Sequence, residues 1–200
     1  MKKNLITIPE SWDDINLGQY LEFLQTDFKE LGEIQKMTRV ISILTDIDEE
    51  TIQNYNLDEI NYIINQLSWC YLKSDGLLNN IVTIDDVKYG VIKNLSSIKV
   101  GEWIDIEGNM DNFKGNLHKI LSVIYRPVTK YRSDDDYEIE DYDANTAKIR
   151  SELFLLKFKT SDAMSASLFF WSFVENYLEN MVASLEQERM EIAMEMISLD

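Results

Sequence analysis

The chain contains few of the residues that build disulfide scaffolds, flexible linkers or metal centres. Its 200 residues include one cysteine, one histidine, two prolines and seven glycines. Cys70 has no partner for an intramolecular disulfide, and its large apolar neighbours in the sequence predict a small buried hydrophobe. Because hydrophobic residues make up 45 % while Pro and Gly are scarce, the composition is that of a folded, helix-rich protein.

Long apolar runs are missing as well. The longest candidate, SASLFFWSFV, is far shorter than the 18 or so residues that a membrane-spanning helix needs. The N-terminal stretch MKKNLITIPES meets a proline and an acidic residue before any apolar run, so no signal peptide is expected. We therefore expect a protein of the reducing cytoplasm with no membrane partner.

The chain has far fewer basic residues than acidic ones. Nineteen Lys and Arg stand against 36 Asp and Glu, which leaves a net charge of −17. The far field of such a chain repels phosphate, so direct binding of nucleic acid or anionic lipid is disfavoured. Solubility is one reason for this acidity, and basic or neutral protein surfaces are the favoured partners, with DNA mimicry as a minor alternative.

Hydrophobic periodicity predicts a mainly helical chain. Apolar residues recur at helical spacing in several segments before residue 75, most strongly in LDEINYIINQLSWCYLK. Alternation then predicts a β-hairpin made of IVTI and VKYGVI, with Asp85 and Asp86 at its tip. Helices resume at VGEWIDIEG and at GNLHKILSVIYR, and Pro127 is expected to end the latter.

Three further features complete the expected architecture. Residues 133–143 are predicted to form an exposed acidic loop, a helix is expected from about Asp143, and another from Asp162. Residues 181–200 are predicted to be a C-terminal helical extension. The expected fold is mainly α, of the α+β class: one domain over residues 1–200, with two related helical modules, a small hairpin between them and a long C-terminal helix.

The two modules are inferred from a similarity of the chain to itself. At an offset of 83, six identical pairs fall within 27 aligned positions: Ile15 and Ile98, Gly18 and Gly101, Gly32 and Gly115, Lys36 and Lys119, Val40 and Val123, and Ile41 and Ile124. The predicted duplication covers approximately residues 5–75 and 88–180, and the matched helices are expected to bury the same faces. Neither module has an obvious core of its own, so the two should pack together.

No catalytic, cofactor-binding or metal-binding residues are predicted. His118 lies among Leu117, Ile120 and Leu121 on the apolar side of a predicted helix, and it has no partners for catalysis or coordination. Motifs such as CxxC, HExxH, GxxxxGK[ST] and GxGxxG do not occur. The two aligned glycines, Gly18 and Gly101, are expected to permit close packing at a helix start. The acidic run SDDDYEIEDYD lacks the spacing of a calcium loop.

The C-terminal sequence carries an apolar stripe with methionines. Such a face can repack against varied partners, although packing within the same chain would use the same stripe, and both interpretations stay open. The residues predicted to bind a partner, which would be a second copy or a client helix, are Leu185, Ile192, Met196 and Leu199.

Two segments resemble a family of proteins of roughly 200 residues encoded by tailed bacteriophages. They are IPESWDDINLGQY, from Ile8 to Tyr20, and VGEWIDIE, and the likeness extends to NLHKILSVIYRPV and DAMSASLFFW. The family's genes lie among those for virion morphogenesis, and the resemblance implies no catalytic residues. The long acidic C-terminal segment departs from the family pattern and leaves the partner open.

The resemblance implies a non-enzymatic bacteriophage assembly protein. Such proteins include tail assembly chaperones, which here would bind a structural client such as a tape-measure protein in the host cytoplasm. The alternative is a structural component retained in the virion near the portal, connector or tail. The implied partners are phage structural proteins or a second copy of the chain, without cofactors. An enzyme or a host-directed inhibitor is a third, minor alternative.

Overall fold

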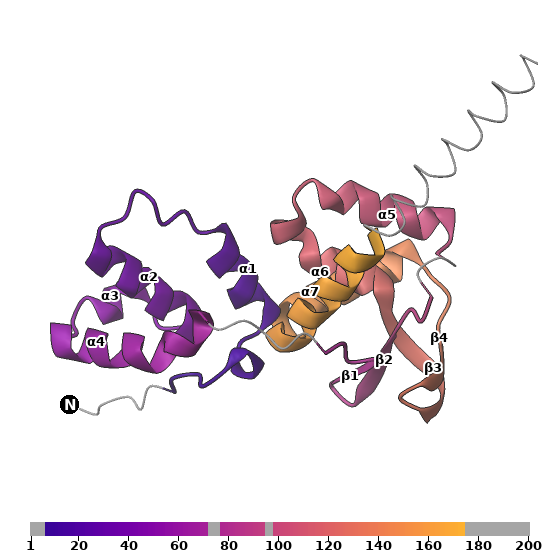
Figure 1. Ribbon diagram of the computed structural model, residues 1–200, viewed down its shortest axis with the longest axis horizontal. Coiled ribbons are helices and arrows are strands. Elements are labelled where there is room, and N and C mark those ends of the chain that lie inside the picture. Colours follow the sequence, from indigo (N-terminus) through magenta and orange to yellow (C-terminus); the bar gives the residue numbers. More distant parts are fainter. Residues whose placement is uncertain (1–6, 72–76, 95–97, 175–200) are drawn as a thin grey trace, which may run out of the picture.

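The computed structural model describes residues 7–71, 77–94 and 98–174 of the chain. The described elements form two neighbouring groups, with α1 to α4 in one and a four-stranded sheet with α5 to α7 in the other (Figure 1). The prediction of a mainly helical α+β fold is confirmed. The elements of the first group are η1 (Trp12–Asp14), α1 (Leu17–Gln25), α2 (Glu33–Thr45), α3 (Glu49–Ile52), α4 (Leu57–Gln66) and η2 (Leu67–Tyr71).

Side-chain caps begin several of these helices, among them α1 and α4. The side chain of Asn16 accepts a hydrogen bond from the backbone N–H of Gln19 at 2.9 Å, and the side chain of Gln19 accepts one from the N–H of Asn16 at 3.1 Å. Asn56 and Glu59 form the same capping box at α4, and such boxes pair backbone donors that the helix leaves free. The buried faces meet in a core of Ile15, Val40, Ile41, Ile43, Leu44, Ile52, Ile60, Ile63, Leu67 and Cys70.

The second group contains an antiparallel sheet with the strand order β1-β2-β3-β4. The predicted hairpin is confirmed, because Ile84 pairs with Val87 and the two residues between them, Asp85 and Asp86, both have positive φ angles, as a tight two-residue turn requires. Residues 160–174 are helical. The other elements are β1 (Ile81–Ile84), β2 (Val87–Val91), α5 (Val100–Met110), α6 (Phe113–Ile124), β3 (Tyr125–Ser133), β4 (Asp136–Ile139) and α7 (Ala144–Lys157).

Two sequence predictions are wrong in this part of the chain. The helix expected to end at Pro127 already ends at Ile124, and Pro127 lies inside β3. The segment 133–143, expected to be an acidic loop, holds the end of β3 and the whole of β4. Its acidic residues alternate with Tyr137, which turns inward and donates a hydrogen bond from its hydroxyl to the carbonyl of Val91 at 2.7 Å.

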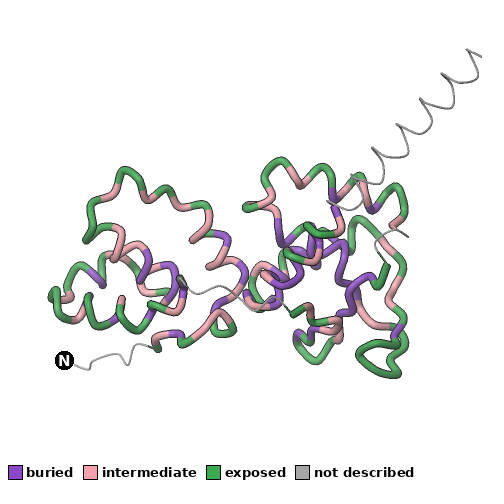
Figure 2. The backbone as a smooth tube through the Cα atoms, in the orientation of Figure 1, coloured by how far each residue is buried: buried purple, intermediate pink, exposed green. Residues whose placement is uncertain are grey.

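Aromatic side chains pack α7 onto the sheet. The ring of Phe154 meets that of Tyr89 edge-on at 5.2 Å, and the ring of Phe158 meets that of Tyr125 at 5.3 Å. Buried residues occur in both groups of elements (Figure 2), and α1 lies against both cores because its Leu17 and Leu21 belong to the core of the second group. The prediction that residues 1–200 form a single domain stays a prediction.

The matched segments of the proposed duplication share helices, but their buried faces agree only in part. In each, a residue near the helix start, Gln19 or Glu102, accepts a hydrogen bond from the backbone N–H three residues earlier at 3.1 Å. Leu21 is buried, however, whereas its counterpart Ile104 is exposed. In α2 and α6, by contrast, the aligned pairs Val40–Val123 and Ile41–Ile124 are buried in both segments. The expectation of the same buried faces is therefore wrong for α1 and α5, and the duplication of residues 5–75 and 88–180 stays a prediction.

Candidate protein-interaction surface

Helix α7 carries large apolar side chains on its outside. Ile149 and Leu156, which are seven residues apart and therefore share one face, are 74 % and 68 % exposed. Leu153, between them, is only partly buried. Single exposed apolar residues are ordinary on protein surfaces, but a row at helical spacing is typical of a helix face that packs against another protein.

The buried side of the same helix carries polar groups. Arg150 is buried, and its Nε donates a hydrogen bond to the carbonyl of Ser122 at 3.0 Å while its Nη1 pairs with Glu140. Ser151 is also buried, and its hydroxyl donates to the carbonyl of Lys148 at 2.7 Å. The outside of α7 is mixed, because the exposed Ile149 and Leu156 are accompanied by exposed charged residues, Lys148, Glu152 and Lys157.

A second buried ion pair lies close to this network. The Nη1 atom of Arg126 in β3 is 3.1 Å from a carboxylate oxygen of Glu102 in α5, and both side chains are almost fully buried. Buried charges are tolerated when they are paired and hydrogen-bonded, so these groups have a structural explanation. The Nε atom of Arg126 and the Nη2 atom of Arg150 are buried without a hydrogen-bond partner among the described residues.

Helix 160–174 exposes a second pair of apolar residues. Leu168 and Trp171, three residues apart, are 56 % and 38 % exposed. The ring of Trp171 also lies 5.0 Å from that of Phe113, at the start of α6. The residues predicted to bind a partner lie outside the described residues, so that assignment stays a prediction for Leu185, Ile192, Met196 and Leu199.

A cleft with a volume of about 630 Å³ is lined by α1, α6 and α7. Gly18 allows a close approach at its floor, because a Cβ atom there would lie 3.0 Å from the carbonyl oxygen of Leu155. Apolar atoms of Leu21 and Leu155 line the cleft together with His118. Polar residues from the first group of helices also line it: Glu22, Gln25, Thr26, Asp27 and Arg39.

His118 is a buried helix residue in this cleft. Burial lowers the pKa of its imidazole, and the nearby charge of Lys119 lowers it further. Its Nδ1 atom is buried without a hydrogen-bond partner among the described residues. The described residues contain no group of three or more His, Cys, Asp or Glu that could hold a metal ion. The part of the chain that the structure describes therefore offers no set of metal ligands around this imidazole, although the carboxylate of Glu152 is near enough to act on its pKa in the opposite direction.

The sequence did not indicate a polar pocket of about 370 Å³ beside Asp162. The Asp162 carboxylate is buried and accepts a hydrogen bond from the side chain of Asn79, and burial raises its pKa. The neighbouring hydroxyl of Ser161 donates to Asp13 in η1, which ties this helix start to the N-terminal segment. An acidic residue near a helix start is usually exposed, so no sequence signal pointed to this burial.

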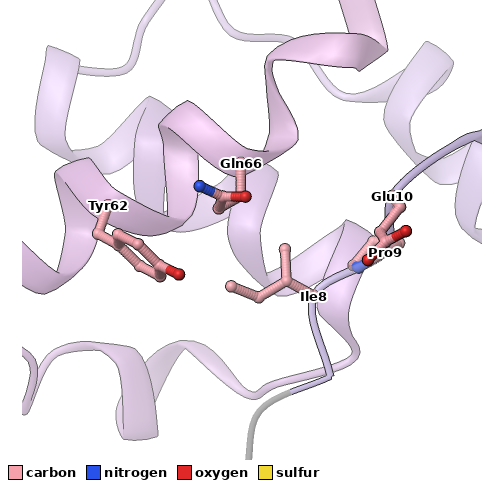
Figure 3. A pocket seen from close by; sticks show the side chains of 5 residues that line it. All are labelled: Ile8, Pro9, Glu10, Tyr62 and Gln66. Carbon is pink, nitrogen blue, oxygen red and sulfur yellow. The ribbon is translucent and has the colours of Figure 1, made fainter.

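A third cavity, of about 350 Å³, lies between the N-terminal segment and α4 (Figure 3). The side chains of Ile8 and Tyr62 point toward each other across it, and Gln66 lies beside them. The indole Nε1 of Trp69 donates a hydrogen bond to the carbonyl of Pro9 at 2.9 Å, which fixes the segment in place.

Two smaller predictions have different outcomes. Cys70 is buried as expected, and burial raises the pKa of its thiol, which makes it less reactive. Gly18 packs closely, but Gly101 has no atom within 4 Å of the position that its Cβ would take. The packing explanation is therefore wrong for Gly101, although the two glycines align in the sequence.

Comparisons with known proteins identify no relative. No protein-family model matches the chain, and neither a curated protein nor a solved structure matches it. Among the described residues, none of the helices combines the length and apolar character that a bilayer crossing requires.

Proposed function

We propose that this chain is a non-enzymatic bacteriophage assembly protein, specifically a tail assembly chaperone that binds a structural client resembling a tape-measure protein. The resemblance of the segments IPESWDDINLGQY and VGEWIDIE to phage morphogenesis proteins supports the choice of system. Such a chaperone acts in the host cytoplasm while the virion is assembled. Its partners are phage structural proteins.

The exposed face of α7 is the observation that carries this proposal. Ile149 and Leu156 present a row of apolar surface on a chain whose net charge is −17. Burying one large apolar side chain against a partner contributes about 1.5–3 kcal/mol, so a few such contacts hold a client while the acidic remainder keeps the complex in solution. The combination suits a protein that shields an aggregation-prone helix.

Quantitative mass spectrometry of purified particles and of infected-cell lysate tests the proposal. A chaperone leaves before maturation, so we expect the protein in the lysate together with its client and at most trace amounts in purified particles. Abundant, stoichiometric copies in mature particles would contradict the chaperone and would favour the alternative of a structural component near the portal, connector or tail.

A further inference from the structure

The cleft lined by α1, α6 and α7 contains a buried polar group that the described part of the chain does not pair. His118 is 7 % exposed, and its Nδ1 atom has no hydrogen-bond partner among the described residues. A buried ring nitrogen without a partner is costly, and a bound group that completes its hydrogen bonding is one explanation for it. The side chain lines the cleft of about 630 Å³ beside apolar atoms of Leu21 and Leu155.

Five polar residues from the first group of helices line the same cleft, and they are called the rim below: Glu22, Gln25, Thr26, Asp27 and Arg39. Side-chain donors of the rim are largely engaged already. The guanidinium of Arg39 pairs with Glu22 at 2.9 Å and with Glu49 at 3.0 Å. The hydroxyl of Thr26 donates to the carbonyl of Glu22 at 2.7 Å, and the side-chain amide of Gln25 donates to a backbone carbonyl within α1 at 3.1 Å.

The groups that remain for a ligand are hydrogen-bond acceptors. Glu22 and Asp27 are exposed, and with Arg39 they leave one net negative charge on the rim. Burial lowers the pKa of His118, so at pH 7 the ring is neutral and one of its two nitrogens has a free lone pair. The cleft therefore combines acceptors and negative charge with the apolar atoms of two leucines.

A cationic side chain with an aliphatic stem matches this combination. Lys and Arg lay their methylene groups along apolar surface, while their charged heads only donate hydrogen bonds. The planar guanidinium of arginine has five donors and so serves several acceptors at once, which suits a cleft with two carboxylates and an imidazole. The same two carboxylates disfavour an acidic ligand.

We propose that this cleft binds an arginine side chain of a partner protein. Its stem lies against Leu21 and Leu155, and its guanidinium donates to the carboxylates of Glu22 and Asp27. Glu22, Gln25 and Asp27 are exposed, so the side chain enters from the surface while its backbone stays outside. This inference goes beyond the proposed function and does not depend on it, because a client and a neighbour in a virion present the same chemistry.

The single histidine of the chain supplies the readout. Because His118 is the only one among 200 residues, the imidazole signals in a proton–carbon NMR spectrum of the full chain come from this cleft alone. The probes are two blocked tripeptides, one with arginine between two glycines and one with citrulline, an uncharged isostere of arginine, in its place. The arginine peptide should shift the His118 signals to saturation, with an affinity at least about fivefold higher than that of the citrulline peptide. Equal affinities, or no shift with either peptide, would overturn the proposal.

Substitutions in the rim separate recognition in the cleft from general attraction to an acidic chain. Glu22→Gln combined with Asp27→Asn should lower the affinity for the arginine peptide about fivefold or more, close to that for the citrulline peptide. Glu50→Gln combined with Asp58→Asn removes the same charge from exposed residues that do not line the cleft, and should change the affinity less than about twofold. Equal effects of the two pairs would show that the attraction is not specific to the cleft and would overturn the proposal.

A free guanidinium compound tests the other source of the same chemistry. The n-butylguanidinium ion has the charge and an aliphatic stem but no peptide backbone, and both it and the arginine peptide should shift the His118 signals. A response to the free ion without a response to the peptide would show that the cleft admits only a small molecule, and would overturn the assignment to a partner protein. These titrations use the chain alone, so their outcome is independent of the particle composition that tests the proposed function.

Discussion

Glu102 has a charge that is enclosed by the protein on nearly every side. It is 3 % exposed, pairs with Arg126 across the boundary between α5 and β3, and accepts a hydrogen bond from the backbone N–H of Lys99. A buried ion pair contributes little compared with a well-packed apolar pair, but removing one partner leaves the other charge unpaired in the interior. The pair is therefore a sensitive point of the fold.

Replacing Glu102 with Gln should lower the free energy of unfolding by about 3–5 kcal/mol, because Arg126 then stays buried without a counter-charge. Urea denaturation followed by circular dichroism measures the change. Glu138→Gln is the matched control, because Glu138 pairs with Lys130 on the surface, where solvent screens the pair, and its loss should change the free energy of unfolding far less. Equal effects of the two substitutions would contradict the importance of burial.

His118 should make stability depend on pH in a definite direction. Burial lowers its pKa in the folded protein below the ordinary value of 6.5, so the unfolded chain takes up a proton first as the pH falls. The contribution of the neutral, buried imidazole to the free energy of unfolding is thus fully present above pH 6.5, and it decreases as the pH falls below that value. We expect the free energy of unfolding to fall between pH 7.5 and 5.5, and to fall less in His118→Gln.

Asp162 should affect the pH dependence of the free energy of unfolding in the opposite direction, and it therefore supplies a control for His118. Burial raises the pKa of this carboxyl, so its ionised form is unfavourable at neutral pH and protonation relieves that cost as the pH falls. Asp162→Asn should therefore make the loss of stability on acidification steeper. Parallel pH profiles for the wild type and His118→Gln would refute the assignment to His118.

At the scale of elements, β2 depends on the absence of a side chain at Gly90. A Cβ atom there would lie 2.7 Å from the Cδ2 atom of Tyr137, whose ring is buried and held by its hydrogen bond to Val91. Gly90→Ala should therefore lower the free energy of unfolding by about 1–3 kcal/mol through overpacking. Thermal unfolding monitored by circular dichroism provides the measurement.

Gly108→Ala is the matched control for that substitution. Gly108 lies in α5 with no atom within 4 Å of the position of an added Cβ. Alanine is the better helix former, so this change should raise the free energy of unfolding by about 0.5–1 kcal/mol. If both substitutions lowered the free energy of unfolding by a similar amount, the loss of a glycine would be the cause, and not the lack of room for a Cβ atom at Gly90.

Local patterns predicted some elements and missed others for physical reasons. The β1–β2 hairpin followed from alternation around Asp85 and Asp86, because turn chemistry is encoded locally. The strand β4 was missed because acidic residues were interpreted as a loop, although Asp136, Tyr137 and Glu138 alternate as in a strand with one buried face. There, the position of Tyr137 depends on β2, which is distant in the sequence.

The exposed face of α7 could not be predicted from its own sequence. Arg150 is buried only because the carbonyl of Ser122 and the carboxylate of Glu140 receive it, and these partners come from other elements. Likewise, Leu21 and Ile104 occupy equivalent positions in the aligned segments but differ in burial, because α1 lies against two cores. Tertiary contacts decided both outcomes.

At the scale of the whole molecule, the described residues already hold two apolar cores. The described members of these cores lie between Ile15 and Val174. We predict that the C-terminal stripe of the sequence serves a partner and is not needed for either core. The sequence predicted the stripe through its periodicity, whereas the exposed residues of α7 and of helix 160–174 came from the structure.

Deletion of Gln187–Asp200 tests this division of the molecule most directly. We predict a midpoint of thermal unfolding within about 3 °C of that of the full chain, which corresponds to a change of about 1 kcal/mol or less for a protein of this size, together with loss of binding to the client. An insoluble or unfolded truncated protein, or a midpoint lowered by much more than this, would show that the stripe belongs to the core and would contradict the account.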